Sequence, residues 1–370
     1  MIVAAPHVLT PGGLVADATV AVSGGRIVDA TGPPDVVLPE GVLAPGLIDL
    51  QVNGCFGIDF AADDDWSEAV RRLPETGVTA FLPTLITAPL ADLVAGLRRM
   101  PDSLPGARVL GMHIEGPFLA EARRGAHDAS LFCDPTSERI DALLEPGTMA
   151  LLTLAPERRG AAAAIARLAR EGVLVSVGHS DAHAEEVALA VEAGARMVTH
   201  LFNAQRGIHH REPGVAGQAL ADERLACGLI LDGHHVVEPV ARVAFAAAPG
   251  RIALVTDAMS AAGMPPGIYD LGGEPVILRD GEPPLRSDGT LAGANLRLDD
   301  AVARAVAIGV SPEMAIEAAS RVPADLLDRR DLGRIEPGAC ADLVWLDDAF
   351  RARATWVGGE LVYDELGVAS

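Results

Sequence analysis

The chain has 370 residues, of which 49% are hydrophobic and 4% aromatic, enough for one barrel-sized domain with a smaller companion. Its formal net charge of −22 argues against nucleic acid or an anionic membrane surface as a partner. All 29 basic residues are arginines, and the absence of lysine excludes a Schiff-base mechanism, a P-loop lysine and a carboxylated-lysine bridge between two metal ions.

The first residues contain no basic stretch followed by an apolar core, and no apolar run approaches the ~18 residues of a membrane span. The four cysteines are far apart in the sequence and form no zinc or redox spacing: Cys55, Cys133, Cys227 and Cys340. We therefore expect a cytoplasmic protein with reduced thiols and no membrane partner.

Eight apolar segments are typical of strands, at residues 47–52, 79–85, 109–114, 150–154, 173–177, 195–199, 226–231 and 252–256. Residues 90–100, 161–170 and 184–194, which lie between them, are typical of helices. Continuous apolar runs are what strands buried on both faces require. Eight strand–helix units predict an α/β fold, a closed (β/α)8 barrel of the TIM type.

The two ends of the chain have a different pattern. Residues 3–43 alternate between apolar and polar, with glycine and proline turn signals, and the same pattern returns in residues 333–346 and 353–357. We predict one small β-sandwich domain built from both termini, residues 1–44 and 334–370, beside a barrel of residues 45–333. A hairpin insertion is expected at residues 269–290, after the last barrel strand.

Four of the predicted strands lead into residues that can bind a metal or move a proton: Glu115, His179, His200 and Asp257. Each alone is more often structural, but the carboxyl ends of barrel strands meet at one face of the molecule. Two imidazoles and one carboxylate, with a position left for water, form the ligand set of a catalytic zinc site. Such an ion makes water more acidic and polarises a carbonyl. Asp257 would take the proton of that water and return it to the departing nitrogen.

Motifs that run in order over nearly the whole chain carry a resemblance to a known family. They lie at residues 45–54, 113–117, 178–180, 199–204, 210–214, 232–236, 255–258 and 338–344. The chain resembles the N-acetylglucosamine-6-phosphate deacetylases of the amidohydrolase superfamily. The resemblance implies metal-dependent hydrolysis of the acetamide of N-acetyl-D-glucosamine 6-phosphate. The galactosamine isomer or another N-acyl amine stays open as the substrate, and a binding barrel without enzymatic activity is the alternative that the complete ligand set disfavours.

The resemblance also implies roles for particular residues. Glu115, His179 and His200 match the metal ligands, and Asp257 matches the catalytic acid and base. His127 and His235 match histidines that contact the substrate, and further matching contacts are Ala126, Asn203, Ala204, Leu291, Ala292 and Gly293. Arg211 matches the phosphate-binding arginine, which in this family reaches the active site of a neighbouring subunit, so a homodimer is expected.

Two points follow from the residues themselves, one about Arg211 and one about the number of metal ions. Arg211 lies in the basic stretch 206–211 of an acidic protein, and a guanidinium binds phosphate bidentately, although a solvated surface arginine remains the alternative. Gln51 and Asn53 stand where the wider superfamily commonly has His-x-His, and their amide oxygens are poor zinc ligands. We therefore predict one divalent metal ion per subunit, Zn2+ by default, with Fe2+, Co2+ and Mn2+ as alternatives.

Overall fold

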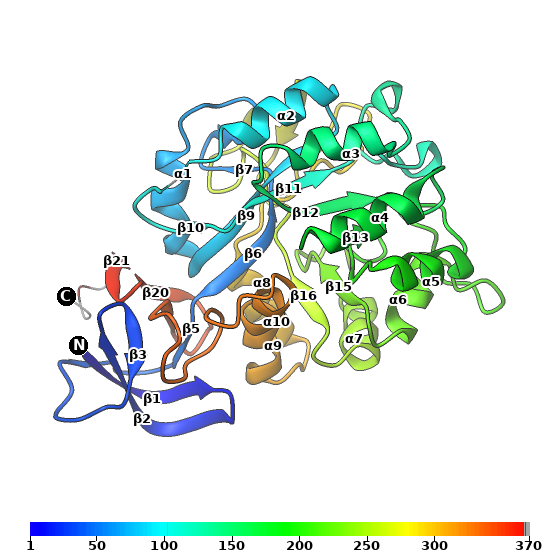
Figure 1. The fold of residues 1–370 in the computed structure, drawn as a ribbon. Helices are drawn as coiled ribbons and strands as arrows, with labels where there is room; N and C mark the ends of the chain where they lie inside the picture. Colours follow the sequence, from blue (N-terminus) through cyan, green and yellow to red (C-terminus); the bar gives the residue numbers. More distant parts are fainter. Residues whose placement is uncertain (102, 366, 368–370) are drawn as a thin grey trace.

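The computed structural model describes residues 1–101, 103–365 and 367. Eight parallel strands alternate with helices around a central barrel, which confirms the predicted (β/α)8 fold (Figure 1). The strands are β6 (Leu47–Val52), β9 (Val78–Ile86), β11 (Met112–Glu115), β12 (Met149–Leu154), β13 (Leu174–Val177), β14 (Met197–Val198), β15 (Ala226–Leu229) and β16 (Ile252–Leu254). A two-residue strand, β10 (Arg108–Val109), precedes β11 and also pairs with β9.

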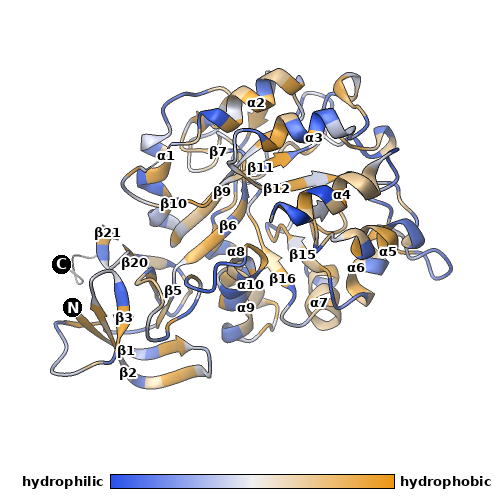
Figure 2. Cartoon of the chain, viewed as in Figure 1, coloured by the Kyte–Doolittle hydropathy of each residue, from blue (hydrophilic) through white to orange (hydrophobic). Residues whose placement is uncertain are grey.

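The barrel helices are α1 (Ser67–Arg72), α2 (Leu90–Arg98), α3 (Ser137–Leu144), α4 (Ala161–Arg170), α5 (Ala184–Ala193), α6 (Gly214–Ala221), α7 (Glu238–Ala247) and α8 (Leu298–Ala307), followed by α9 (Pro312–Ala318) and α10 (Arg321–Leu326). Helix α4 shows why they form, because Ala161, Ala164, Ile165 and Leu168 make one buried stripe at helical spacing. The strands β6 and β9 are hydrophobic, whereas α3 and α4 carry hydrophilic stretches (Figure 2). None of the helices among the residues described has the length and apolar character that crossing a membrane requires.

Strand β14 is shorter than the five residues that its sequence predicts. The amide of Ala195 still donates to the carbonyl of Ala190 in α5, at 2.9 Å, so the strand cannot begin there. At the other end the backbone of His200 has a positive φ of 28°, which turns the chain out of the sheet. This early turn places His200 at the barrel mouth.

The barrel closes between β6 and β16. Val52 and Ala258 form a parallel bridge, and the amide of Asp257 donates to the carbonyl of Gln51 at 2.9 Å. Below this point the carboxylate of Asp49 in β6 accepts hydrogen bonds from the hydroxyl of Thr256, at 2.6 Å, and from its amide, at 3.2 Å. Asp49 therefore joins the first strand of the barrel to the segment that follows the last one.

This buried carboxyl predicts a pH-dependent stability. Asp49 is 1% exposed, and burial raises its pKa from the ordinary 3.8 to about 7. The folded state thus binds the proton more tightly than the unfolded chain. The stability contributed by protonated Asp49 is complete below pH 3.8 and is lost as the pH rises through about 7. Relative to the parent, Asp49→Asn should gain about 2 kcal/mol between pH 5 and pH 7. Urea unfolding of both proteins in the presence of a chelator measures this, and a pH-independent difference would contradict it.

Both termini contribute to a second, mixed sheet, as predicted. It consists of β1 (Ile2–Thr10), β2 (Gly13–Ser23), β3 (Arg26–Val28), β4 (Val36–Val37), β5 (Val42–Pro45), β19 (Leu343–Leu346), β20 (Ala352–Val357) and β21 (Glu360–Asp364). Strand β5 lies between β1 and β19, so N-terminal and C-terminal strands are neighbours in this sheet (Figure 1). The sheet curls until Arg26 bridges Cys340, around a core that contains Trp345 and Trp356. We propose residues 1–44 and 334–370 as this domain and residues 45–333 as the barrel domain.

Two hairpins lie at the carboxyl ends of the barrel strands. The small one follows β6 and pairs β7 (Gly54–Cys55) with β8 (Ile58–Asp59). The larger one pairs β17 (Gly267–Leu271) with β18 (Glu274–Leu278), which confirms the hairpin predicted after the last strand. Its apolar side chains pack with those of Ile86, Met259 and Ala292, so it is fixed beside the end of β9.

Candidate metal centre and active site

A cavity of about 570 Å³ opens at the carboxyl ends of the barrel strands, a size typical of small-molecule sites. Most of the side chains that the sequence singles out lie in its wall, namely Glu115, Ala126, His127, His179, His200, Asn203, Ala204, His235, Asp257, Leu291 and Gly293. Segments separated by well over a hundred residues in the chain are therefore brought together around one cavity.

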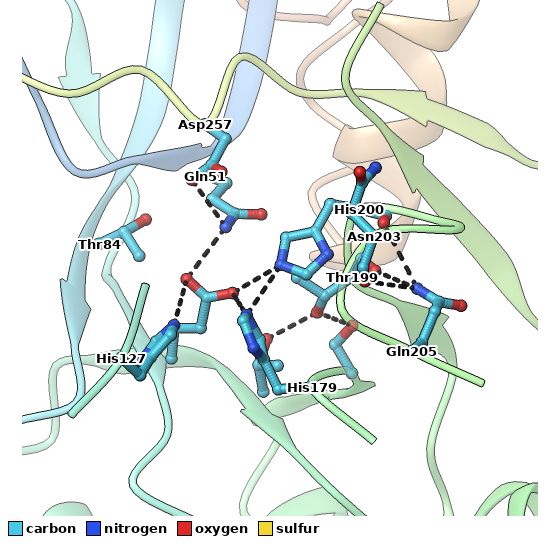
Figure 3. A network of polar contacts seen from close by, with 12 residues as sticks. Gln51, Thr84, His127, His179, Thr199, His200, Asn203, Gln205 and Asp257 are labelled. Atoms are coloured by element: carbon cyan, nitrogen blue, oxygen red, sulfur yellow. Dashed lines mark hydrogen bonds and ion pairs between the residues drawn. The ribbon is translucent and has the colours of Figure 1, made fainter. Parts of the chain in front are cut away.

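Glu115, His179 and His200 converge at the floor of this cavity. Nε2 of His179 lies 3.1 Å from Oε1 of Glu115, Nε2 of His200 lies 2.9 Å from the same oxygen, and the two nitrogens are 3.1 Å apart (Figure 3). All three residues are at most 4% exposed. Within the part of the chain that the structure describes, this is the one group of three or more His, Cys, Asp or Glu residues close enough to hold a metal ion.

The hydrogen bonds around the cluster fit a bound cation. Nδ1 of His179 lies 2.9 Å from the backbone carbonyl of Arg123, which can only accept, so Nδ1 carries the proton. The other ring nitrogen, Nε2, faces Glu115 and His200 and is thus the atom available to a metal ion. A carboxylate oxygen and two imidazole nitrogens packed this closely are the ligand set of a divalent ion such as zinc. The three residues present thus match the metal site that the sequence predicts.

Three of the converging residues adopt an uncommon backbone conformation. His179, His200 and Asp257 have positive φ angles of 48°, 28° and 52°. For residues other than glycine such conformations cost about 1–3 kcal/mol each and persist only where surrounding contacts enforce them. Around His179 these contacts include a hydrogen bond from the amide of Ala120 to its carbonyl, at 2.9 Å. The geometry of the cluster is therefore set by the fold.

Asp257 lies beside the cluster, held by two side-chain amides from β6 and the residue after it. Nε2 of Gln51 donates to Oδ1 of Asp257, at 3.0 Å, and to Oε2 of Glu115, at 3.2 Å. Nδ2 of Asn53 donates to the same Asp257 oxygen at 2.7 Å. Gln51 and Asn53 therefore act as hydrogen-bond donors to carboxylates.

The two carboxylates of the site have opposite pKa shifts. Burial, reinforced by the nearby charge of Glu115, raises the pKa of Asp257 to about 6. Burial also acts to raise the pKa of Glu115, but its close polar contacts with His179 and His200 outweigh burial and hold that pKa well below its ordinary value. A pair of carboxylates separated in this way divides the work between a permanent anion and a group that exchanges protons near neutral pH.

His127 and His235 are each oriented by a polar neighbour. Nδ1 of His127 lies 2.8 Å from Oγ1 of Thr87 and 3.4 Å from its amide, which can only donate, so Nε2 carries the ring proton. Burial and the nearby His179 lower the pKa of His127 to about 3, so the ring is neutral. Nδ1 of His235 lies 2.7 Å from Oδ2 of Asp232, and this hydrogen bond outweighs the effect of burial and keeps the pKa of Asp232 at about 2.

Two of the predicted contacts do not line the cavity of this chain. Arg211 lies in an exposed turn, with Nη1 2.8 Å from Nε2 of His210. Ala292 is fully buried in the apolar cluster beneath the hairpin, while Leu291 and Gly293 on either side of it reach the cavity. His113, to which the sequence assigns no role, is buried with its ring nitrogens on the hydroxyls of Thr84 and Thr153.

Other residues of the site are missing from the sequence-based set. Arg123, Arg124 and Thr290 line the cavity, and Thr87 and Asp232 orient histidines. For Asp232 a signal exists, because it precedes His235 by three residues in a short loop. The Arg123–Arg124 pair next to His127 is another. No sequence signal marks Thr87, because its role depends on where β9 ends relative to the loop that carries His127, 40 residues away.

The chain matches the amidohydrolase family over residues 42–362. An N-acetylgalactosamine-6-phosphate deacetylase of Escherichia coli O157:H7 is 39% identical over 330 residues, which cover 86% of this chain and 87% of that protein. An N-acetylglucosamine-6-phosphate deacetylase of Danio rerio is 39% identical over 341 residues, which cover 87% of this chain and 84% of its own.

Solved structures of deacetylases are also similar to this chain. An N-acetyl-D-glucosamine-6-phosphate deacetylase mutant from Mycobacterium smegmatis, in complex with N-acetyl-D-glucosamine 6-phosphate, superimposes with a TM-score of 0.93 at 34% identity, over 98% of this chain and 99% of that one. The enzyme of Thermotoga maritima gives a TM-score of 0.91 at 32% identity, over 98% and 100%. The chain therefore belongs to the amidohydrolase family, and within it to the branch of N-acetylglucosamine- and N-acetylgalactosamine-6-phosphate deacetylases.

Proposed function

We propose that the protein hydrolyses N-acetyl-D-glucosamine 6-phosphate to D-glucosamine 6-phosphate and acetate. The observation that carries the proposal is the convergence of Glu115, His179 and His200 beside Asp257 in one cavity of a chain 39% identical to deacetylases of this substrate class. The test is acetate release from N-acetyl-D-glucosamine 6-phosphate, measured together with metal content.

The proposed chemistry divides among the residues of the cavity. A divalent cation held by Glu115, His179 and His200 would supply Lewis-acid chemistry, making water more acidic and polarising the acetyl carbonyl. Asp257 accepts a proton from the attacking water and later donates it to the leaving amine. The Nε2–H of neutral His127 donates to the oxygen on which negative charge develops.

We propose one divalent ion per subunit, with Zn2+ as the default and Fe2+, Co2+ and Mn2+ as alternatives for the same ligands. The engagement of Gln51 and Asn53 with carboxylates supports a single ion. Elemental analysis of protein purified without added metal gives the stoichiometry and the identity of the ion. We also propose a cytoplasmic location, which the four free cysteines support.

We propose a homodimer in which Arg211 reaches the neighbouring active site. Its exposed position outside the cavity of its own chain supports this arrangement. Apolar side chains are exposed in the same loop, where Ile208 is 55% exposed, and at α7, where Val237 just before the helix is 54% and Val243 within it 56% exposed. Such residues suit a subunit interface.

Arg211→Gln is expected to raise KM for the phosphorylated sugar by roughly 10–100-fold with a smaller change in kcat, because a charge-assisted bond to phosphate is lost. Steady-state kinetics with N-acetyl-D-glucosamine 6-phosphate measures the effect. Arg170→Gln, an exposed arginine at the end of α4, is the matched control. Equal handling of the free sugar and its phosphate ester by the parent would contradict the assigned role.

The second candidate substrate is N-acetylgalactosamine 6-phosphate, because a relative named for it is as similar as those named for the glucosamine compound. The two differ in one epimeric hydroxyl. Acetate release from both sugar phosphates, from other N-acyl amines and from free N-acetylglucosamine separates these possibilities. A metal-free chain with no activity toward any of them would instead indicate a binding barrel.

A further inference from the structure

We propose that Asp181 is a positioning residue that ties the metal ligand His179 to the turn that carries Arg211. The link to Arg211 rests on the proposed function of that arginine. Asp181 lies two residues after His179, and its side chain is one-third exposed. It contacts neither the cluster nor the space where substrate would lie, so it acts through other residues.

The carboxylate of Asp181 is shared by two arginines from different loops. Nε of Arg123 donates to Oδ1 at 2.8 Å, and Nη2 of Arg206 donates to Oδ2 at 2.7 Å. Nε of Arg206 also donates to the backbone carbonyl of Asp181 at 2.7 Å. Charge-assisted bonds of this kind are stronger and more directional than neutral ones, so the three segments are clamped together.

This Arg123–Asp181–Arg206 clamp is linked to His179 through the backbone of Arg123. The carbonyl that accepts the Nδ1 proton of His179 belongs to the residue whose side chain Asp181 holds. Arg123 ends a short 3-10 turn, Glu121–Arg123, and the bond of its side chain to Asp181 adds to the backbone hydrogen bond from its amide to Ala120 in holding that carbonyl in place. Partners of a metal-ligating histidine's second nitrogen fix its tautomer and ring orientation, and losing them typically weakens metal binding 10–100-fold.

Asp181 is itself anchored independently of the two arginines. Its amide donates to Oε1 of Glu157 at 2.6 Å, and the hydroxyl of Ser180 donates to Oε2 of the same residue at 2.7 Å. Glu157 lies in the loop after β12, close to the barrel wall. Asp181 therefore has a position fixed by Glu157, and it holds the loops that carry Arg123 and Arg206 relative to that position.

On its other side the clamp holds the base of the turn that carries Arg211. The amide of Arg206 donates to the carbonyl of Ser180 at 2.9 Å, and Nη1 of Arg206 lies 3.7 Å from Oε2 of Glu212. His209 and Glu212 exchange two backbone hydrogen bonds, which close the turn around Arg211. The metal site and the proposed phosphate site therefore share one anchor.

The test measures separately the link through Arg123 to the metal site and the link through Arg206 to the turn that carries Arg211. Zn2+ affinity is measured by competition with a chromophoric chelator, without substrate, and KM for N-acetyl-D-glucosamine 6-phosphate is measured at saturating Zn2+. Asp181→Ala should weaken Zn2+ binding about 10–100-fold and also raise KM. Arg123→Gln should likewise weaken Zn2+ binding, whereas Arg206→Gln should change mainly KM.

Asp325→Ala is the matched control, because its carboxylate is likewise shared by two arginines, Arg321 and Arg334, at the opposite end of the barrel. It should leave both quantities within twofold of the parent. If Asp181→Ala also binds Zn2+ within twofold of the parent, the proposal is overturned, even when its melting temperature falls. If that variant does not fold, Asp181→Asn and Arg123→Gln decide the same question. A parent that releases no acetate would overturn the proposed function, whereas the Zn2+ affinities would still decide the role of Asp181.

Discussion

Replacing Asp257 with asparagine is expected to lower kcat by about 10²–10⁴-fold while one metal ion per subunit stays bound. Asparagine keeps the size of the side chain and the acceptor for the amides of Gln51 and Asn53. It cannot take a proton from water or return one to the amine. Metal binding should persist because the ligand cluster consists of Glu115 and the two histidines. Single-turnover acetate release and metal analysis of the same preparation measure both effects.

Two results would contradict the proposed role of Asp257. Near-normal turnover of Asp257→Asn would assign proton transfer to another group, and loss of the metal would make Asp257 part of the metal site. The pH profile of the parent adds a check, because only ionised Asp257 can accept a proton. With its pKa raised to about 6, kcat/KM should fall as the pH decreases through that region.

Glu115→Gln is expected to abolish metal retention and to reduce acetate release at least 10³-fold at trace metal. The carboxylate is the anionic member of the cluster, and Oε1 is the atom that both imidazoles approach. A neutral amide of the same shape offers a weaker ligand oxygen, and its NH2 group repels a cation. Elemental analysis after gel filtration and titration with Zn2+ measure the loss.

Glu317→Gln on α9, which removes the same charge from a residue paired with Arg321, should retain metal and activity. A Glu115→Gln protein that still binds one ion with parental affinity would be inconsistent with the proposed ligand set. Restoration of activity by excess Zn2+ would show that the fold survives and that affinity alone has changed.

The sequence predicts most of the barrel because its strands are buried on both faces. Segments 47–52 and 161–170 match β6 and α4 at both ends, since turns or polar residues bound each apolar stretch. The chemistry-bearing residues at the strand ends are equally visible, because the topology of a parallel barrel places them at one face.

Features that depend on contacts between loops could not be read in this way. The two-residue length of β14 reflects a hydrogen bond to the preceding helix and the turn at His200. The orientation of His179 depends on a backbone carbonyl at residue 123, and that of His127 on Thr87. Backbone carbonyls carry no side-chain signature, and threonine is common at strand ends, so neither partner stands out before the loops are placed.

The position of β5 between β1 and β19 has a consequence for how the protein is made. During synthesis the N-terminal strands leave the ribosome about 300 residues before the strands that complete their sheet. Until then one edge of β5 has no neighbour, and apolar side chains such as Leu43 have no cover from Trp345. A polypeptide that ends before residue 343 would leave this apolar surface exposed. Chaperones and proteases act on chains with such exposed apolar surface. The sheet can therefore be completed only after the strands from residue 343 onward have been synthesised.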